Sequence, residues 1–287
     1  MRLPKFYYHA EEIEPDIWDI GFGQEPEADD WKCWDGNDLI GVFKASTDQR
    51  GYPVCRADLT PKVRMSQADF YNKVRLRGDG YSLVKLKHHS IVAFLFYAMY
   101  GNTDSQLICG NGLDRTIDVV GGTCSLGMVD TEYSGEIGSN IVNFWGLEDW
   151  WGRCAEWIDN VSSIGGIWSI QDDDVFRQIT VMGSGYISSL RVGDFLDAIP
   201  DYTEGSTTTG FCDRFYINKN QNILCRGNAS SQLDNGIVCI DCTYNNSYTT
   251  DSVGSRLAFR GDIIVEDDIQ AFRSIPVTNI EAHPVCP

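Results

Sequence analysis

The sequence predicts a single α+β domain, in which two early helices precede short antiparallel strands and long loops. Both segments with helical periodicity lie in the first part of the chain of 287 residues. Glycine-containing turn signals then recur roughly every ten residues, a texture typical of short strands. Helices followed by strands indicate segregated elements and not a βαβ array. No Pro- or Ser-rich linker is present, so we expect one domain over 1–287.

The predicted elements follow in order along the chain. The first helix is expected over residues 66–73, with Ser66 as N-cap and Asp69 at the capping-box position. The second is expected over residues 88–100, an almost wholly apolar segment that ends at Gly101. Strands are expected at residues 39–44, 167–170, 176–181, 237–240 and 255–259.

The charge of the chain restricts its partners. The formal net charge is −18, from 41 acidic and 23 basic residues. This balance argues against nucleic-acid binding, which needs clustered Lys and Arg, and it suits neutral or basic partners. The first residues contain no apolar core of a secretory leader, and residues 90–100 are too short to span a bilayer. We expect no membrane insertion, and synthesis in a cytosol or as part of a longer secreted protein.

One segment combines aromatic and acidic residues at high density. Residues 143–157 (NFWGLEDWWGRCAEW) contain four of the eight tryptophans and three carboxylates. Such a segment is compatible with a substrate pocket, a sugar-stacking surface or a packed core. Its composition alone leaves these three interpretations open.

Several motifs occur in a characteristic order. They are 40–44 (IGVFK), 64–70 (RMSQADF), 78–83 (GDGYSL), 100–106 (YGNTDSQ), 143–152 (NFWGLEDWWG), 155–157 (AEW) and 253–260 (VGSRLAFR). This order resembles the C-type-lectin-like fold in its formylglycine-generating-enzyme (sulfatase-modifying factor) branch, over nearly the full chain. Similar proteins include ligand-binding domains of tail and receptor-binding proteins from phages of gut Bacteroides. Some of these are variable proteins diversified by retroelements.

The resemblance assigns the tryptophan-rich segment to the interior, beneath the loops. It implies that Trp145, Trp150, Trp151 and Trp157 pack in the core, where indole N–H groups bond to the backbone. Acidic side chains of the same segment, Glu148, Asp149 or Glu156, are then expected to anchor loop amides or a basic side chain such as Arg256.

The resemblance also raises an oxidase activity. Enzymes of this branch oxidise a substrate cysteine with two active-site cysteines separated by four residues, just before the closing strand. Cys225, Cys239 and Cys242 occupy that region, and no pair of them has that spacing. The four histidines do not match the iron-binding triad of ergothioneine-type relatives, and other catalytic motifs are missing. We therefore expect no catalytic residues, and interpret His88 and His89 as one structural and one exposed histidine.

Metal sites and cofactors are not expected from the sequence. The ten cysteines are interpreted as mostly reduced. For Cys239 and Cys242, plain burial stands beside a zinc site or a local disulfide as alternatives. The acidic runs at 172–174 and 266–268 are interpreted as solvated turns, with a structural calcium ion left open. No metal ligand is assigned.

The segment before the closing strand has the composition of a recognition surface. Residues 226–252 are rich in Asn, Ser, Tyr, Asp and Gly, and the resemblance places variable positions in this region. Tyrosine offers large and stiff contact area, while Asn and Ser supply adaptable hydrogen bonds. The expected ligand-binding residues are Tyr216, Asn228, Ser230, Asn235, Asp241, Tyr244, Asn245, Asn246 and Tyr248. The alternative is a plain turn-rich loop, which explains the glycines well and the tyrosines less well.

The hypothesis from the sequence is a non-catalytic binding domain of a bacteriophage tail or fibre protein. Its portions are an N-terminal strand and loop region (1–60), the helices with the tryptophan-rich core (61–160), and a loop-rich ligand-binding region with the closing strand (161–287). The expected location is the virion, and the expected partners are a bacterial surface glycan or outer-membrane protein and other virion proteins. A homotrimer is expected from similar proteins. The alternatives are an oxidoreductase of the formylglycine-generating type and a structural virion component, such as a head fibre or decoration.

Overall fold

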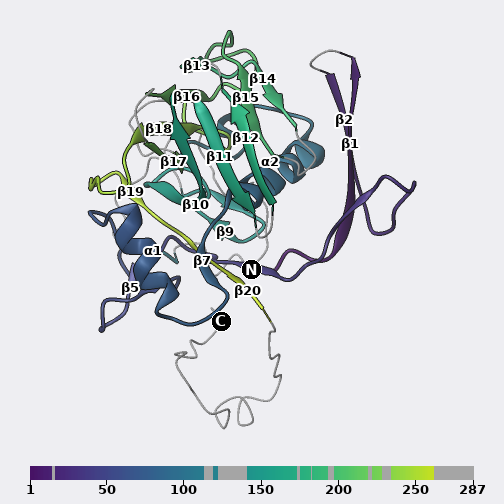
Figure 1. Ribbon diagram of the computed structural model, residues 1–287. Coiled ribbons are helices and arrows are strands. Elements are labelled where there is room, and N and C mark those ends of the chain that lie inside the picture. The colour runs from purple at the N-terminus through teal and green to yellow at the C-terminus, as the bar shows by residue number, and fades with distance from the viewer. Residues whose placement is uncertain are drawn as a thin grey trace.

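A computed structural model describes most of the chain (Figure 1). The described residues are 1–14, 17–112, 119–121, 141–172, 175–181, 183–192, 197–218, 222–227 and 234–261. Within these ranges the protein is mostly β-sheet with few helices, which agrees with the α+β class.

Two of the three described helices lie where the sequence predicts them. Helix α1 (Gln67–Arg75) begins after Ser66, whose side chain accepts a hydrogen bond from the backbone N–H of Asp69 over 3.1 Å. Helix α2 (Leu86–Tyr100) begins two residues earlier than expected and ends at Gly101, which has φ 59°. Helix α3 (Ser105–Cys109) is not predicted from the sequence, because five residues are too few to show a periodicity.

The strands are short and numerous. They are β1 (Phe6–Glu14), β2 (Ile17–Gly23), β3 (Lys32–Trp34), β4 (Asp38–Ile40), β5 (Ser46–Thr47), β6 (Pro53–Val54), β7 (Tyr81–Leu83), β8 (Asn143–Phe144), β9 (Leu147–Glu148), β10 (Ala155–Ile164), β11 (Ile167–Asp172), β12 (Val175–Thr180), β13 (Gly185–Tyr186), β14 (Ser189–Arg191), β15 (Ile199–Tyr202), β16 (Arg214–Ile217), β17 (Asn222–Arg226), β18 (Ile240–Tyr244), β19 (Val253–Gly254) and β20 (Leu257–Arg260). The main sheet has the order β12-β11-β10-β17-β18-β16-β13, and β19 pairs with β10. The β16–β18 and β10–β19 pairs are parallel, so the expectation of only antiparallel strands is wrong at these two places.

Three of the five predicted strands are confirmed, as β11, β12 and β20. The strand expected at residues 39–44 ends at Ile40, after which Lys44 turns inward and is buried. The strand expected at residues 237–240 is wrong, because the chain forms a turn there and β18 begins only at Ile240. This turn is held by Asp213, whose carboxylate accepts the backbone N–H groups of Gly236 and Val238.

The main sheet is covered on both faces. Neighbouring residues of a strand point to opposite faces, so Trp157 and Ile158 of β10 enter different clusters. Ile158 packs with α2, and Trp157 packs with α1 through Phe70. Helices α1 and α2 lie at opposite sides of the body in Figure 1. Helix α1 covers part of its face, and a surface site can form on the strands beside it.

The first strands form an arm that projects from the body (Figure 1). A separate sheet of order β2-β1-β3 carries it. The pairing of Phe6 with Trp34 anchors the arm, and their rings stack with centroids 5.9 Å apart in the core. Strand β20, the last described strand of the chain, lies between β4 and β7 in a three-stranded sheet. It thereby joins the last described part of the chain to two early strands.

Candidate binding surface

The tryptophan-rich segment supplies scaffold and not surface. Trp150, Trp151 and Trp157 each expose at most 1% of their surface. The indole N–H of Trp151 donates to the carbonyl of Gly110 over 2.9 Å, and that of Trp157 donates to the carbonyl of Met65 over 3.1 Å. These two contacts fix the large rings in the core and satisfy their polar atoms.

Two tryptophans differ from the expectation. Trp145 is only partly buried, because its backbone is left-handed (φ 51°) and its ring lies flat against Phe144 at 5.3 Å. Among the described residues the indole N–H of Trp150 has no hydrogen-bond partner. The Trp150 ring instead lies between His89 at 4.4 Å and the guanidinium of Arg256 at 5.2 Å. The cation–π contact with Arg256 helps to hold the ring in the core.

Arg256 joins the closing strand to the tryptophan-rich segment. It is fully buried and its Nε donates to Oε1 of Glu156 over 2.8 Å. Its other nitrogens donate to the carbonyls of Gly41, Val42, Glu148 and Asp149 at 2.6–3.1 Å. The Glu148 carboxylate in turn accepts the backbone N–H of Gly121. The acidic side chains of the segment therefore act as internal anchors.

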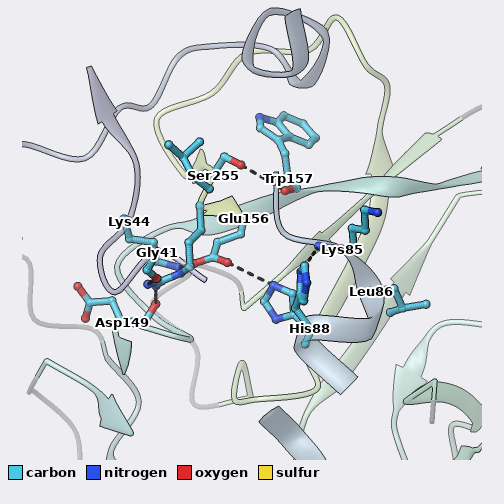
Figure 2. A network of polar contacts seen from close by, with 12 residues as sticks. Gly41, Lys44, Lys85, Leu86, His88, Asp149, Glu156, Trp157 and Ser255 are labelled. Atoms are coloured by element: carbon cyan, nitrogen blue, oxygen red, sulfur yellow. Dashed lines mark hydrogen bonds and ion pairs between the residues drawn. The ribbon is translucent and has the colours of Figure 1, made fainter. Parts of the chain in front are cut away.

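Glu156 lies at the centre of a buried charge network (Figure 2). Nζ of Lys44 lies 2.8 Å from its Oε1, and Nε2 of His89 lies 3.2 Å from its Oε2. Burial raises the pKa of this carboxyl, but Arg256 and Lys44 outweigh that effect and hold its pKa well below the usual range. Burial lowers the pKa of His89 to about 4, so this imidazole is neutral near pH 7.

Both adjacent histidines are internal, so the expectation that one of them is exposed is wrong. His88 and His89 each expose 1% of their surface. Nδ1 of His88 accepts the backbone N–H of Lys85 over 3.0 Å and thereby caps α2. His88 also faces Asp38, with Nε2 3.8 Å from the carboxylate. The first turn of α2 is covered on two sides, by β4 and by β10, which gives each histidine a carboxylate partner.

A row of side chains crosses the main sheet on the α1 face. Trp157, Cys225, Asp241 and Tyr216 are cross-strand partners on β10, β17, β18 and β16. Directly paired residues point to the same face of a sheet. The row therefore runs from the tryptophan beneath α1 to a half-buried tyrosine near the sheet edge. It brings two predicted ligand-binding residues, Asp241 and Tyr216, next to each other.

The row continues past Tyr216 to the edge of the sheet. The Arg214 guanidinium lies between the rings of Tyr186 and Tyr216, 5.1 and 5.0 Å from their centroids. The hydroxyl of Tyr186 donates to the carboxylate of Asp234 over 3.2 Å. Burial raises the pKa of Tyr216 to about 12, so its hydroxyl remains a hydrogen-bond donor at neutral pH.

At the other end of β18, two tyrosines form a stack. The rings of Tyr244 and Tyr248 lie 4.7 Å apart at an angle of 13°. Tyr244 also meets Trp157 edge to face at 6.1 Å, and burial raises its pKa to about 12. Tyr248 is 44% exposed. The inner ring is thus fixed on the core, and the outer ring is presented to solvent.

The turn between these tyrosines is ordered by its own side chains. Oδ1 of Asn245 accepts from the backbone N–H and the hydroxyl of Ser247, and its carbonyl accepts the N–H of Tyr248. The carbonyl of Asn246 accepts the N–H of Ala68, in the first turn of α1. Asn245 and Asn246 are exposed. The turn is therefore pre-organised, which lowers the entropic cost of binding a ligand.

We call this set of residues the tyrosine face. It consists of Tyr186, Arg214, Tyr216, Asp241, Thr243, Tyr244, Asn245, Asn246 and Tyr248. Asp241 exposes only 8% of its surface, and its Oδ1 accepts both the N–H and the hydroxyl of Thr243. Burial raises the pKa of Asp241. Its role is to hold neighbouring groups in place and not to reach far into solvent.

The other predicted ligand-binding residues do not join this surface. Asn235 is 1% exposed, and its Oδ1 accepts from the thiol of Cys239 in the turn before β18. Asn228 and Ser230 lie outside the described residues. Three residues of the tyrosine face were missed: Tyr186, Arg214 and Thr243. Two of them lie two positions from a predicted residue, so strand alternation would have pointed to Arg214 and Thr243.

The cysteines and acidic residues considered as metal or thiol sites are buried or hydrogen-bonded where the structure describes them. No group of three potential metal ligands occurs among the described residues. Cys239 and Cys242 form no disulfide and are fully buried. Asp172 binds Arg177 and Asn160, while the rest of its acidic run and residues 266–268 lie outside the described ranges.

No protein-family model matches the chain, and no curated protein matches it.

Helix α2, the longest that the structure describes, has 15 residues, and none of the described helices has the length and apolarity to cross a bilayer.

Proposed function

We propose that this protein is a non-catalytic ligand-binding domain whose binding surface is the tyrosine face. The observation that carries the proposal is the Tyr244–Tyr248 stack, which a buried Trp157 supports from below and an ordered turn extends. Stiff aromatic area beside exposed amides is the chemistry by which loops recognise glycans and protein surfaces. A rigid sheet that carries such a turn is a typical scaffold for recognition.

We further infer that the domain has a C-type-lectin-like fold and belongs to a phage tail or fibre protein. The supporting observations are the order of the motifs and the position of residues 253–260, which contain β20 and join the two ends of the described chain. The ligand would be a glycan or an outer-membrane protein of the bacterial surface. Assembly as a homotrimer in the virion would multiply a weak affinity at each site. No cofactor is assigned.

The surroundings of the cysteines disfavour an oxidoreductase. Cys239 and Cys242 have no exposed surface, and burial raises the pKa of Cys242 well above its ordinary value. A thiol reacts as the thiolate and needs access to its substrate, so these two groups are poorly suited to oxidise a peptide cysteine. Packing as small apolar side chains in the interior accounts for both cysteines without a catalytic role.

The proposal is tested with a labelled, purified chain and a panel of gut Bacteroides strains. Tyr248→Ala should weaken binding to a recognised strain about tenfold, because truncating an aromatic anchor typically costs 1 kcal/mol or more. The matched control is Tyr202→Ala, because Tyr202 has the same exposed fraction of 44% and lies in the separate β14–β15 sheet.

Two results would contradict the proposed function. In the first, Tyr248→Ala and Tyr202→Ala bind the strain equally well, which places the ligand elsewhere. In the second, the parent chain binds none of the strains but binds tightly to a purified virion protein, which favours a structural virion component. An oxygen uptake with a cysteine peptide that disappears in Cys239→Ser would establish the oxidoreductase instead.

A further inference from the structure

The arm has a composition unlike that of the body. Between Tyr8 and Lys32 the sequence contains nine carboxylates and neither lysine nor arginine. The nine are Glu11, Glu12, Glu14, Asp16, Asp19, Glu25, Glu27, Asp29 and Asp30. The arm also contains two tryptophans, Trp18 and Trp31. It is therefore a projecting element that is both strongly acidic and aromatic.

The two faces of the β1–β2 hairpin differ in character. On one face Tyr8 pairs with Phe22, and Ala10 pairs with Ile20, which gives an apolar stripe along the hairpin. Trp18, which pairs with Glu12, continues this stripe toward the tip. The apolar side chains of the stripe are partly buried and pack against the main core. At the tip Ile13 is 59% exposed and Ile17 is 50% exposed. Side chains of this size at the end of a projecting arm indicate a surface that a partner covers.

The opposite face is acidic and has a defined shape. Trp31 folds back over Gly21 and Gly23, where a Cβ atom at either position would lie 3.2 Å from its ring. The Trp31 ring also stacks on His9 at 5.9 Å, and Nδ1 of His9 lies 3.1 Å from the carboxylate of Asp30. The two glycines thus provide the flat floor on which the indole rests.

This packing leaves an open hollow of about 520 Å³ beside the indole. Its lining includes the carboxylates of Glu11, Asp19, Glu27 and Asp30. All four of these side chains are exposed. Carboxylates around an aromatic face attract lysine and arginine side chains by charge and by cation–π contact.

One edge of the arm is open for backbone pairing. Strand β2 has seven residues and pairs with β1 alone among the described residues. An edge strand presents unpaired N–H and C=O groups, and an extended segment of another chain can add to it. The added strand would place alternate side chains over the acidic face and over the apolar stripe.

We propose that the arm is a docking element for a basic, strand-forming segment of another protein, which adds to the free edge of β2. Its cationic side chains meet the carboxylates around Trp31, and its apolar side chains meet the exposed Ile13 and Ile17 at the tip of the hairpin. The arm of a second copy is a poor occupant of this edge, because between Tyr8 and Lys32 it carries nine carboxylates and neither lysine nor arginine. This inference concerns a different surface from the tyrosine face and does not rest on the proposed function.

The test uses the full chain and a fluorescent peptide of eight residues that alternates lysine and valine. Binding is measured by anisotropy at low and at high salt. We expect the peptide to bind at low salt and to lose affinity at high salt, because exposed charges are screened. A peptide that alternates glutamate and valine should not bind, and a lysine–valine peptide with a central proline should bind more weakly, because proline lacks the N–H for edge pairing.

Matched variants locate the site. The double variant Glu11→Gln/Asp19→Asn should weaken binding of the lysine–valine peptide about fivefold, as expected for the loss of two exposed ion pairs. The control is Asp58→Asn/Asp79→Asn, which changes the net charge equally at two exposed carboxylates of the body. Equal affinity of the two double variants would overturn the proposal, and so would equal binding of the glutamate–valine peptide. Sedimentation tests a third outcome. If the parent chain is an oligomer and Glu11→Gln/Asp19→Asn changes its oligomeric state, the arm serves self-association and the proposal is overturned.

Discussion

His89 is the residue at which burial and charge compete most directly. Its pKa is lowered to about 4 from 6.5, chiefly by burial. As the pH falls from 6.5 to 4, the unfolded chain takes up a proton that the folded chain does not, so the folded state loses stability. The contribution is fully present above pH 6.5 and amounts to about 3 kcal/mol. We predict that His89→Gln makes the decrease in unfolding free energy between these pH values shallower, as measured by urea titrations.

An unchanged slope in His89→Gln would contradict the account of this network. Glu156 adds a separate loss of stability at lower pH. Its pKa is lowered in the folded state, so its stabilising contribution is complete above the ordinary pKa of 4.5 and is lost as the pH falls below that value.

Trp150 tests whether the tryptophan-rich segment is scaffold. The ring is 1% exposed and lies between His89 and Arg256. We predict that Trp150→Ala lowers the free energy of unfolding by about 3–5 kcal/mol, as is usual when a large buried ring is removed. Trp145→Ala should cost less than half of that, because Trp145 is only partly buried. Similar losses in both variants, measured by chemical denaturation, would contradict the difference in their roles.

At the scale of elements, α1 supports the turn that carries Tyr248. The N–H of Ala68 donates to the carbonyl of Asn246, and the N–H of Arg64 donates to the carbonyl of Thr250. Ser66 caps the same helical turn. We predict that Ser66→Ala lowers the unfolding free energy by about 1 kcal/mol, a typical loss for an N-cap. Amide hydrogen exchange should accelerate at residues 67–69, while α2 exchanges as before.

Ser66→Thr serves as the matched variant for this prediction. Threonine also accepts a hydrogen bond at the N-cap, and it keeps the hydroxyl that Ser66 donates to Oδ2 of Asp69 over 2.7 Å, so it should retain most of the stability and exchange of the parent chain. If Ser66→Ala and Ser66→Thr behaved alike, the cap would not hold this end of α1.

The elements that the sequence predicts well are those with local signals. Ser66 and Gly101 mark helix ends by capping chemistry, and Gly165 and Gly166 mark the turn directly before β11. Strands β1 and β2 were not predicted, because carboxylates occur on both of their faces and hide the alternation. The turn after Gly236 was mistaken for a strand because its bonds go to Asp213, which is distant in sequence.

The same division applies to the tyrosine face. Tyr248, Asn245 and Asn246 are exposed on a turn, which their local composition indicates. The burial of Asp241 and Asn235 depends on strand partners and on the turn at Gly236, which the sequence does not reveal. Arg214 enters the surface through a parallel pairing of β16 with β18, a contact between distant segments.

At the scale of the whole molecule, the two proposed surfaces belong to separate parts. The tyrosine face lies on the main sheet near α1, and the arm projects from the side of the body away from α1 (Figure 1). Each has its own aromatic groups, and different packing supports each. The arm is anchored through Phe6 and Trp34, whereas Tyr244 rests on Trp157. The two surfaces should therefore act independently.

This independence is tested by removing the arm. Tyr8 pairs with Lys32, so residues 9–31 can be replaced by Asn-Gly, which suits a two-residue hairpin turn. The nine carboxylates are lost and the net charge changes from −18 to −9. We predict that the shortened chain still folds, because the anchoring pair of Phe6 and Trp34 remains in the core, and that it melts below the parent chain, because the contact of Phe22 with Phe6 is lost. It should bind the recognised bacterial strain with unchanged affinity and no longer bind the lysine–valine peptide. A folded variant that retains the peptide, or that loses the strain, would show that the two surfaces are not separate.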